Sequence, residues 1–249
     1  MVESHCYCSV VENRRPVQVH GHRGARAVYA ENTLAGFRYA IAAGVDAIEM
    51  DVAVTRDDVP VISHGPRLRH CGAIRSLNLA DLRRAAPGIP TLGEILALAP
   101  RRDFLFNIEL KSFPKRPQYA PPPACFAEIA LAAIRRAGVE RRVLIQSFDF
   151  RVLHAMQALA PTIPRAALFA LRNESFLSVA RRADVRTVSP EFHLVTAKKV
   201  QAARDAGIDV LTWTPNRPRQ WKRLIEAGVA AIITDDPAAL IAYLAANPA

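Results

Sequence analysis

The sequence predicts a single α/β domain, a (β/α)8 TIM barrel with a small insertion after the second strand. Short apolar runs alternate with helical patterns eight times along the chain, and this alternation is typical of a closed parallel barrel. The length of 249 residues fits one such barrel. The first predicted strand is not followed by a GxGxxG turn, which disfavours the alternative of a doubly wound open sheet.

The predicted strands and helices follow one another in regular order. We expect strands at 17–21, 46–54, 104–110, 142–147, 166–170, 185–189, 208–213 and 230–234. We expect helices at 32–43, 91–99, 124–137, 150–160, 174–183, 196–206, 217–227 and 236–246. Thr91 and Asp236, which stands before Pro237, are typical helix starts. Glycines stand where left-handed helix caps would fall, at Gly44, Gly138, Gly207 and Gly228.

Two segments interrupt the simple alternation. Residues 57–63 form an extra extended run after the turn signal Asp57-Asp58, so we interpret 46–63 as a strand and a short return arm above the barrel. The proline-rich segment 111–123 reads as a loop, because core strands continue on both sides of it. The whole chain, 1–249, is therefore expected to be one domain, with 1–16 as a flexible N-terminal extension.

Composition narrows the class of protein. Hydrophobic residues make up 51% and charged residues 22%, as in folded globular proteins. The net charge of +10 attracts anions, but the arginines are scattered and no basic block contains aromatic residues. We therefore expect no specific nucleic-acid partner. A weak peripheral contact with a membrane stays open, and the oligomeric state is not predicted.

The sequence also predicts where in the cell the protein is located. The first residues contain no apolar signal segment, and no apolar run is long enough to span a membrane. A cytoplasmic location is the prediction. The cysteines have no zinc-site spacing, so we expect free thiols at Cys6, Cys8, Cys71 and Cys125.

Two acidic residues interrupt an apolar strand in "DAIEMDVAV", which begins at Asp46. Glu49 and Asp51 are two positions apart, so they point to the same side of a strand. Two carboxylates in a half-buried site repel each other and are costly to desolvate. A divalent cation removes both problems, and oxygen ligands favour Mg²⁺ or Ca²⁺. The alternative is an ordinary charged face exposed to solvent.

A second strand repeats this pattern in "NIELK", which begins at Asn107. Glu109 and Lys111 share one face near the end of the strand. The carboxyl ends of barrel strands converge on one mouth, so Glu109 can become a third metal ligand. Lys111 can then face an anionic oxygen held by the same ion.

Two histidines are candidates for proton transfer, because the unperturbed pKa of histidine is about 6.5. His22 ends the first strand in "HGHRGA", next to Arg23, whose guanidinium suits phosphate. His64 closes the return arm and would lie over the mouth. A pair of histidines on either side of a metal-bound anion suits a reaction that needs one acid and one base.

Together these residues resemble the glycerophosphodiester phosphodiesterase (GDPD) family. The resemblance is carried by an ordered set of segments across almost the whole chain: "HRGA", "ENTLAGF", "GVDAIEMDVAVTRDDVPVISH", "TLGEIL", "IELK", "QSFD", "LTWTPN" and "GVAAIITDDP". It implies a (β/α)8 barrel that hydrolyses glycerophosphodiesters to sn-glycerol 3-phosphate and an alcohol.

The resemblance also implies roles for individual residues. It matches Glu49, Asp51 and Glu109 to metal ligands, His22 and His64 to the acid and base, and Arg23 and Lys111 to phosphate-binding cations. It matches Trp213 to the glycerol end of the pocket, and Glu31 and Asn32 to supporting positions. The implied mechanism is attack of the glycerol 2-hydroxyl on phosphorus, followed by opening of a cyclic phosphate by water.

One departure from the family pattern concerns the second histidine. An aspartate usually follows it, whereas Gly65 follows His64 here. Two alternatives therefore stay open beside the phosphodiesterase. One is a lysophospholipase D activity on lysophospholipids, and the other is a non-catalytic barrel that binds anionic head groups.

Overall fold

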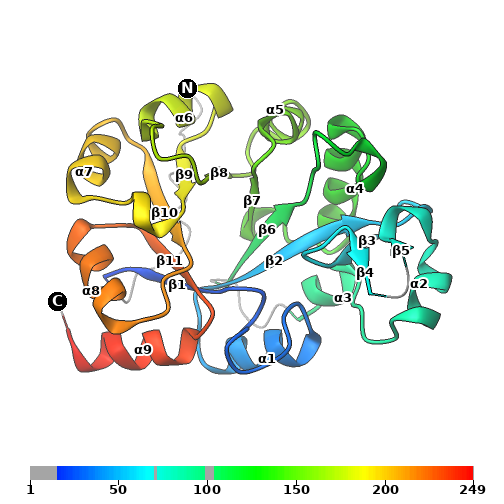
Figure 1. The fold of residues 1–249 in the computed structure, drawn as a ribbon, viewed down its shortest axis with the longest axis horizontal. Coiled ribbons are helices and arrows are strands. Elements are labelled where there is room, and N and C mark those ends of the chain that lie inside the picture. Colours follow the sequence, from blue (N-terminus) through cyan, green and yellow to red (C-terminus); the bar gives the residue numbers. More distant parts are fainter. Residues whose placement is uncertain (1–15, 70–71, 99–103, 249) are drawn as a thin grey trace.

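Eight parallel strands form a closed barrel in the computed structural model, which describes residues 16–69, 72–98 and 104–248. Helices surround the strands (Figure 1). Around the ring, the strands are β1 (Gln18–Gly21), β2 (Ala47–Val54), β6 (Leu105–Leu110), β7 (Val143–Ser147), β8 (Arg165–Phe169), β9 (Thr187–Pro190), β10 (Asp209–Trp213) and β11 (Ala231–Thr234). Pairing of β1 with both β11 and β2 closes the ring. The predicted barrel is confirmed.

The expected helices are present between the strands, with ends that differ by a few residues. They are α1 (Leu34–Ala42), α3 (Leu92–Leu96), α4 (Pro123–Arg136), α5 (Phe150–Leu159), α6 (Phe176–Ala183), α7 (Ala197–Asp205), α8 (Pro218–Ala227) and α9 (Pro237–Ala246). Helix α1 begins later than expected because Thr33 caps it and accepts a hydrogen bond from the Gly36 backbone. Thr91 forms a capping box with Glu94 at the start of α3.

The insertion contains the predicted return arm and one helix that the sequence analysis did not predict. Strand β3 (Pro60–Ile62) runs antiparallel to β2. It is followed by a ribbon of β4 (Arg67–Leu68) and β5 (Gly72–Ala73), and then by α2 (Leu79–Ala85). These elements lie together at one side of the barrel (Figure 1). Helix α2 is only two turns long, so it leaves little periodicity in the sequence.

Short 3-10 turns complete the chain. They lie at η2 (Ile74–Ser76), η3 (Pro117–Tyr119), η4 (Glu140–Arg142) and η5 (Phe192–Leu194). The segment 111–123 is otherwise irregular, as its prolines predicted. In the described part of the chain, no helix combines the length and apolar character that a membrane crossing requires.

Some expectations concern residues outside the described ranges. The N-terminal extension falls there except for Pro16, and so do Cys6, Cys8 and Cys71. These expectations stay predictions, as does the assignment of the whole chain to one domain. Cys125, on α4, is an exposed free thiol.

The interior of the barrel is apolar near the amino ends of the strands, called the lower end, and polar near their carboxyl ends, called the upper end. Inward side chains of six strands form the lower apolar cluster: Ala47, Leu105, Leu144, Ala166, Leu211 and Ala231. Successive inward positions on a strand are two residues apart. One step up, β2 therefore presents Glu49 and β6 presents Asn107, and the next step presents Asp51 and Glu109. Because side chains alternate between the inside and the outside of the barrel along each strand, the polar layer lies directly above the apolar cluster.

The loop from β1 to α1 packs tightly because of Gly24. Its φ of +89° lies in the left-handed region, and a Cβ built on it would stand 2.7 Å from the Gly36 carbonyl carbon and 2.9 Å from the Phe37 nitrogen. Only glycine satisfies both constraints at low cost. This close approach fixes the loop that carries His22 and Arg23 against the first turns of α1.

Gly24→Ala should therefore lower the free energy of unfolding by about 2 kcal/mol or more, since left-handed strain and overpacking add. Chemical denaturation measures this. Gly88→Ala is the matched control, because nothing lies within 4 Å of the Cβ it would add. Equal stability of the two variants would show that the loop relaxes freely.

Candidate active site

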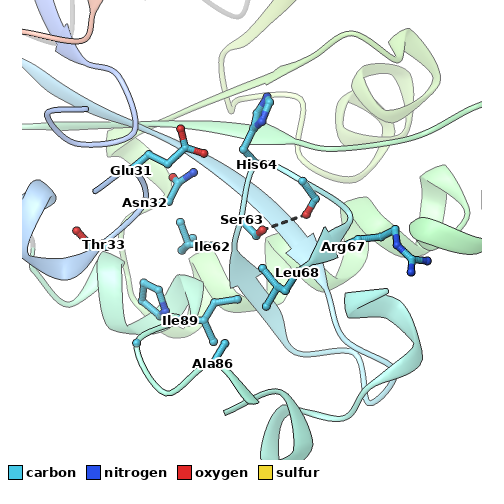
Figure 2. Close-up of a pocket in the computed structure, with 13 residues that line it drawn as sticks. Glu31, Asn32, Thr33, Ile62, Ser63, His64, Arg67, Leu68, Ala86 and Ile89 are labelled. Carbon is cyan, nitrogen blue, oxygen red and sulfur yellow. Dashed lines mark hydrogen bonds between the residues drawn. The ribbon is translucent and has the colours of Figure 1, made fainter. Parts of the chain in front are cut away.

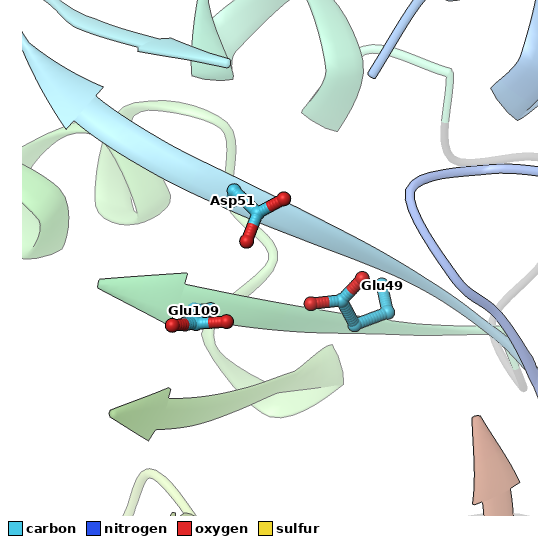
Figure 3. A group of neighbouring side chains, drawn as sticks. All are labelled: Glu49, Asp51 and Glu109. Carbon is cyan, nitrogen blue, oxygen red and sulfur yellow. The ribbon is translucent and has the colours of Figure 1, made fainter. Parts of the chain in front are cut away.

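Three carboxylates meet at the upper end of the barrel. Glu49 and Asp51 come from β2 and Glu109 from β6, where Asp51 is the register partner of Glu109. One ligand oxygen from each lies within 4.8 Å of the others, and Figure 3 shows the three groups facing one space. All three are buried, with exposed fractions of 2%, 1% and 7%. The structure thus brings together the carboxylates that the sequence singled out.

Neighbouring donors hold two of these carboxylates in place. Glu49 accepts hydrogen bonds from the Arg23 backbone nitrogen at 3.0 Å and from Gln146 Nε2 at 3.1 Å. Asp51 Oδ2 accepts one from Asn32 Nδ2 at 2.9 Å. Arg23 and Asn32 both have left-handed backbone angles, with φ of 50° and 59°. The β1–α1 loop therefore bends twice to direct donors at the cluster.

The two predicted phosphate-binding cations lie against the same carboxylates. Lys111 Nζ is 2.8 Å from Glu109 Oε1 and 3.6 Å from Asp51 Oδ1. Arg23 Nε is 3.1 Å from Asp51 Oδ2, and its Nη1 donates to Glu31 Oε2 at 2.8 Å. Both cations are at the site but are engaged with carboxylates.

The charges of the cluster are not balanced. Burial, and then the negative charges of Asp51 and Glu109, raise the pKa of Glu49 well above its ordinary value. Burial also raises the pKa of Glu109, to about 7, although Lys111 opposes this. Burial acts on Asp51 too, but the charges of Lys111 and Arg23 outweigh it and lower its pKa.

This imbalance, with one unpartnered oxygen, fits a divalent cation. Asp51 Oδ1 is buried and has no hydrogen-bond partner among the described residues, although Lys111 lies 3.6 Å away. Three buried carboxylates that face one space are the oxygen donors preferred by hard cations such as Mg²⁺ and Ca²⁺. Glu49, Asp51 and Glu109 are therefore the residues that would hold the ion.

His22 lies beside the cluster and has a carboxylate of its own. Its Nδ1 is 2.5 Å from Asp235 Oδ1, and its Nε2 is 4.0 Å from Glu49 Oε2. Asp235, which follows β11, also accepts a hydrogen bond from Asn216 Nδ2 at 2.7 Å. Burial alone would raise the pKa of Asp235, but His22, Asn216 and the charge of Arg26 lower it. An ionised Asp235 can only accept, so the His22 proton sits on Nδ1 and Nε2 faces the site.

His64 has a different environment at the exposed rim. It follows β3, and the neighbouring Ser63 anchors this turn by donating its backbone N–H to Asp51 O at 2.9 Å. Desolvation, followed by the positive charge of Lys111, lowers the pKa of His64 below its ordinary value. The second histidine is thus near the cluster, as predicted. Asp51 and Glu31 act on it by their charges, but no carboxylate in the described part of the chain is hydrogen-bonded to it as Asp235 is to His22.

Trp213 ends β10, which is opposite β6 in the ring of strands. Its Nε1 donates to Ser189 O at 2.9 Å. Its ring packs edge to face on Phe148, with centroids 5.6 Å apart, and Phe148 is 47% exposed. Trp213 is therefore three strands away from β2 in the ring, and Phe148, which follows β7, is two strands away.

Fold and carboxylate cluster together define a class, the barrel proteins whose mouth carries acidic residues that could hold a divalent cation. The particular family follows from comparison with known proteins. The model of the glycerophosphoryl diester phosphodiesterase family matches residues 22–239, and the chain belongs to this family. The predicted resemblance is confirmed, and so is the assignment to phosphodiester hydrolases.

Individual relatives agree with this assignment. A glycerophosphodiester phosphodiesterase of Caldanaerobacter subterraneus subsp. tengcongensis is 30% identical over 88% of this chain and 94% of that protein. A structure from Silicibacter pomeroyi, provisionally assigned to glycerophosphoryl diester phosphodiesterases, is 30% identical with a TM-score of 0.85, and 95% of this chain and 96% of that chain are covered. An Oleispira antarctica phosphodiesterase, solved with the product sn-glycerol-3-phosphate, is 23% identical with a TM-score of 0.79 and supports the fold. It covers 92% of this chain and 96% of that chain.

Sequence reasoning assigned no role to Asp235 or Gln146, although both lie in segments that carried the resemblance. Asp235 is 213 positions from His22, and Gln146 is 97 positions from Glu49. One signal was available for Gln146, since it is a polar residue within the apolar strand "VLIQS". It resembles the interruption that revealed Glu49 and Asp51.

Cation binding should depend on pH because Glu109 has a pKa of about 7 in the metal-free protein. Below pH 7 the cation must displace a proton, so its affinity falls as pH falls. Without the ion, the raised pKa of Glu109 makes the folded protein less stable above pH 7, where this carboxyl must ionise. A cation binds more tightly at pH 8 than at pH 6, so the rise in Tm on adding Mg²⁺ or Ca²⁺ should be larger at pH 8. Calorimetric titration in buffers of different ionisation enthalpy should detect proton release at pH 6. Equal affinity at both pH values would contradict this.

Proposed function

We propose that the protein hydrolyses glycerophosphodiesters to sn-glycerol 3-phosphate and an alcohol, using Glu49, Asp51 and Glu109 to hold one Mg²⁺ or Ca²⁺. The observation that carries this proposal is the buried trio of carboxylates, whose ligand oxygens lie within 4.8 Å of one another at the barrel mouth. Family membership supplies the substrate class. Carboxylate oxygens are ligands for hard cations, so they favour both Mg²⁺ and Ca²⁺.

The phosphate would bind between the cluster and the two cations. A bound divalent cation supplies Lewis-acid stabilisation of negative charge on the phosphate oxygens. Arg23 and Lys111, now paired with carboxylates, would turn toward the phosphate oxygens when these carboxylates are shared with the ion. Trp213 and Phe148 would line the glycerol end, and the indole N–H, which already donates to Ser189 O, fixes the orientation of the Trp213 ring there.

The two histidines would move the protons. Asp235 holds the His22 proton on Nδ1, so Nε2 is free to exchange a proton with the substrate. One histidine takes the proton of the glycerol 2-hydroxyl, which attacks phosphorus, and the other protonates the departing alcohol. Water then opens the cyclic phosphate with the two roles exchanged. Either histidine can begin as the base.

The two other interpretations are less consistent with these observations. A non-catalytic barrel would have no need of the His22–Asp235 pair. A lysophospholipase D activity, and peripheral contact with a membrane, have one supporting observation. Four exposed apolar side chains lie on loops that follow barrel strands: Val28, Tyr29, Phe148 and Leu171. A cytoplasmic location stays a prediction.

Release of sn-glycerol 3-phosphate tests the proposal directly. Turnover of glycerophosphocholine, glycerophosphoethanolamine, glycerophosphoglycerol and a lysophospholipid is measured with Mg²⁺ or Ca²⁺ and with chelator, and we expect chelator to abolish it. Glu49→Ala and His22→Ala should each lower kcat/KM by roughly 10²-fold or more. Glu226→Ala, an exposed carboxylate on α8, is the control. Near-normal turnover in either site variant would remove that residue from the mechanism.

Asp235→Asn should lower kcat by roughly 10²-fold or more, because the imidazolium of His22 loses its charged partner. KM and cation affinity should change little. Asp236→Asn is the matched control, since Asn also caps a helix and Asp236 accepts a hydrogen bond from the Ala239 backbone at the start of α9. If kcat falls equally in both variants, or cation affinity falls with kcat, Asp235 acts on the fold rather than through His22.

A further inference from the structure

A cavity of about 340 Å³ lies between the start of α1 and the insertion. This volume is within the usual range of small-molecule pockets. His64 and Glu31 stand at one end of it, Ile62 lies between, and Ile89 and Ala86 lie at the other end (Figure 2). No step of the mechanism described so far uses this space.

The cavity adjoins the catalytic site. His64 lines it, and so does Asn32, whose side chain donates to the metal-ligand candidate Asp51 at 2.9 Å. Trp213 is on β10 and the cavity is next to β2 and β3, so the two lie on different sides of the mouth. A diester whose glycerol is near Trp213 would therefore direct its other substituent toward the cavity.

Polar side chains that line the cavity are already bonded within the protein. Asn32 donates to Asp51, and Thr33 donates to Ala30 O and caps α1. Ser63 donates its hydroxyl to Gly65 O at 3.0 Å. These groups have little capacity left for the hydroxyls of a polar ligand.

The charges at the cavity do not favour a cationic ligand. Glu31 is its acidic lining residue, and it is shared by Arg23 at 2.8 Å and Arg26 at 2.9 Å. Arg67 points away from Ile62 and Ile89 (Figure 2). A quaternary or primary ammonium group would therefore find neither a free carboxylate nor the ring face of a Phe, Tyr or Trp among the described lining residues.

What the cavity offers instead is an apolar wall, formed by Ile62, Leu68, Ala86, Ile89 and Pro90. Burial of alkyl groups against such a wall is favourable and needs no specific partner. We propose that this cavity receives the departing alcohol and selects an uncharged alcohol with an alkyl portion over a cationic one. The proposal rests on the proposed function. It concerns the reaction in which a diester and water give sn-glycerol 3-phosphate and the neutral alcohol, whose oxygen takes up one proton as the ester bond to phosphorus breaks.

Gly65 allows the charge of the cavity to be changed. Gly65 lines the cavity, and a Cβ added there would meet its nearest neighbour, Arg67 O, at 3.4 Å. Its φ does not lie in the left-handed region. Asp and Asn can therefore both be introduced at this position, and they differ in charge but hardly in shape.

The experiment compares kcat/KM for sn-glycerol-3-phospho-1-butanol, sn-glycerol-3-phosphoethanolamine and sn-glycerol-3-phosphomethanol. We expect the butanol ester to exceed the ethanolamine ester by roughly tenfold or more. In Gly65→Asp this ratio should fall by roughly tenfold, whereas Gly65→Asn should lower it much less. Ile89→Trp, which fills the cavity, should lower the ratio of butanol to methanol ester by about tenfold. Thermal denaturation shows whether each variant is folded.

The failures of the two proposals are distinguishable. The methanol ester carries an alcohol too small to fill the cavity, so absence of turnover with all three esters would overturn the proposed function. Turnover of all three with equal kcat/KM would overturn the assignment of the cavity alone. So would equal ratios in Gly65→Asp and Gly65→Asn, or a ratio of butanol to methanol ester that Ile89→Trp leaves unchanged.

Discussion

Repulsion among three buried carboxylates is the constraint on which the site depends. Glu49, Asp51 and Glu109 are held within 4.8 Å of one another, where each ionised group is costly to desolvate and raises the energy of the others. Arg23 and Lys111 offset part of this cost, which is why Asp51 keeps a lowered pKa. Burial, and then the charges of the neighbouring carboxylates, raise the pKa values of Glu49 and Glu109, because two cations do not balance three carboxylates. A divalent cation bound by these carboxylates would supply the missing positive charge.

The architecture around the cluster meets this constraint from two directions. Parallel register between β2 and β6 fixes the separation of the carboxylates, because Asp51 and Glu109 are direct partners in the ladder. The β1–α1 loop then brings the Arg23 N–H and the Asn32 amide to them, at the cost of two left-handed residues. The tight contact of Gly24 with α1 holds this loop in place. Strand spacing therefore positions all three carboxylates, and the strained loop holds two of them, Glu49 and Asp51.

The sequence predicted those parts of the structure that follow from local periodicity. Glu49 and Asp51 point to the same side of their strand because they are two positions apart. The helix starts at Thr91 and Asp236 follow from the ability of these side chains to cap a helix. Helix α2 was missed because Leu82 is its only buried residue, so no apolar stripe marks it. The contact between His22 and Asp235 could not be predicted in this way. It depends on how β1 meets β11 when the barrel closes, where the His22 N–H bonds to Thr234 O at 2.9 Å.

The two histidines differ in how the structure holds them. His22 is on the first barrel strand's loop, and a chain of hydrogen bonds through Asp235 to Asn216 and Thr234 fixes it. His64 is on the insertion, exposed, and next to Gly65. In the proposed mechanism, the barrel strands and their loops carry the carboxylates, the phosphate-binding cations and His22, whereas the insertion carries His64 and would lie beside the departing alcohol. Because changes in the insertion leave the β2–β6 register untouched, substrate choice can vary without disturbing the carboxylates that the chemistry requires.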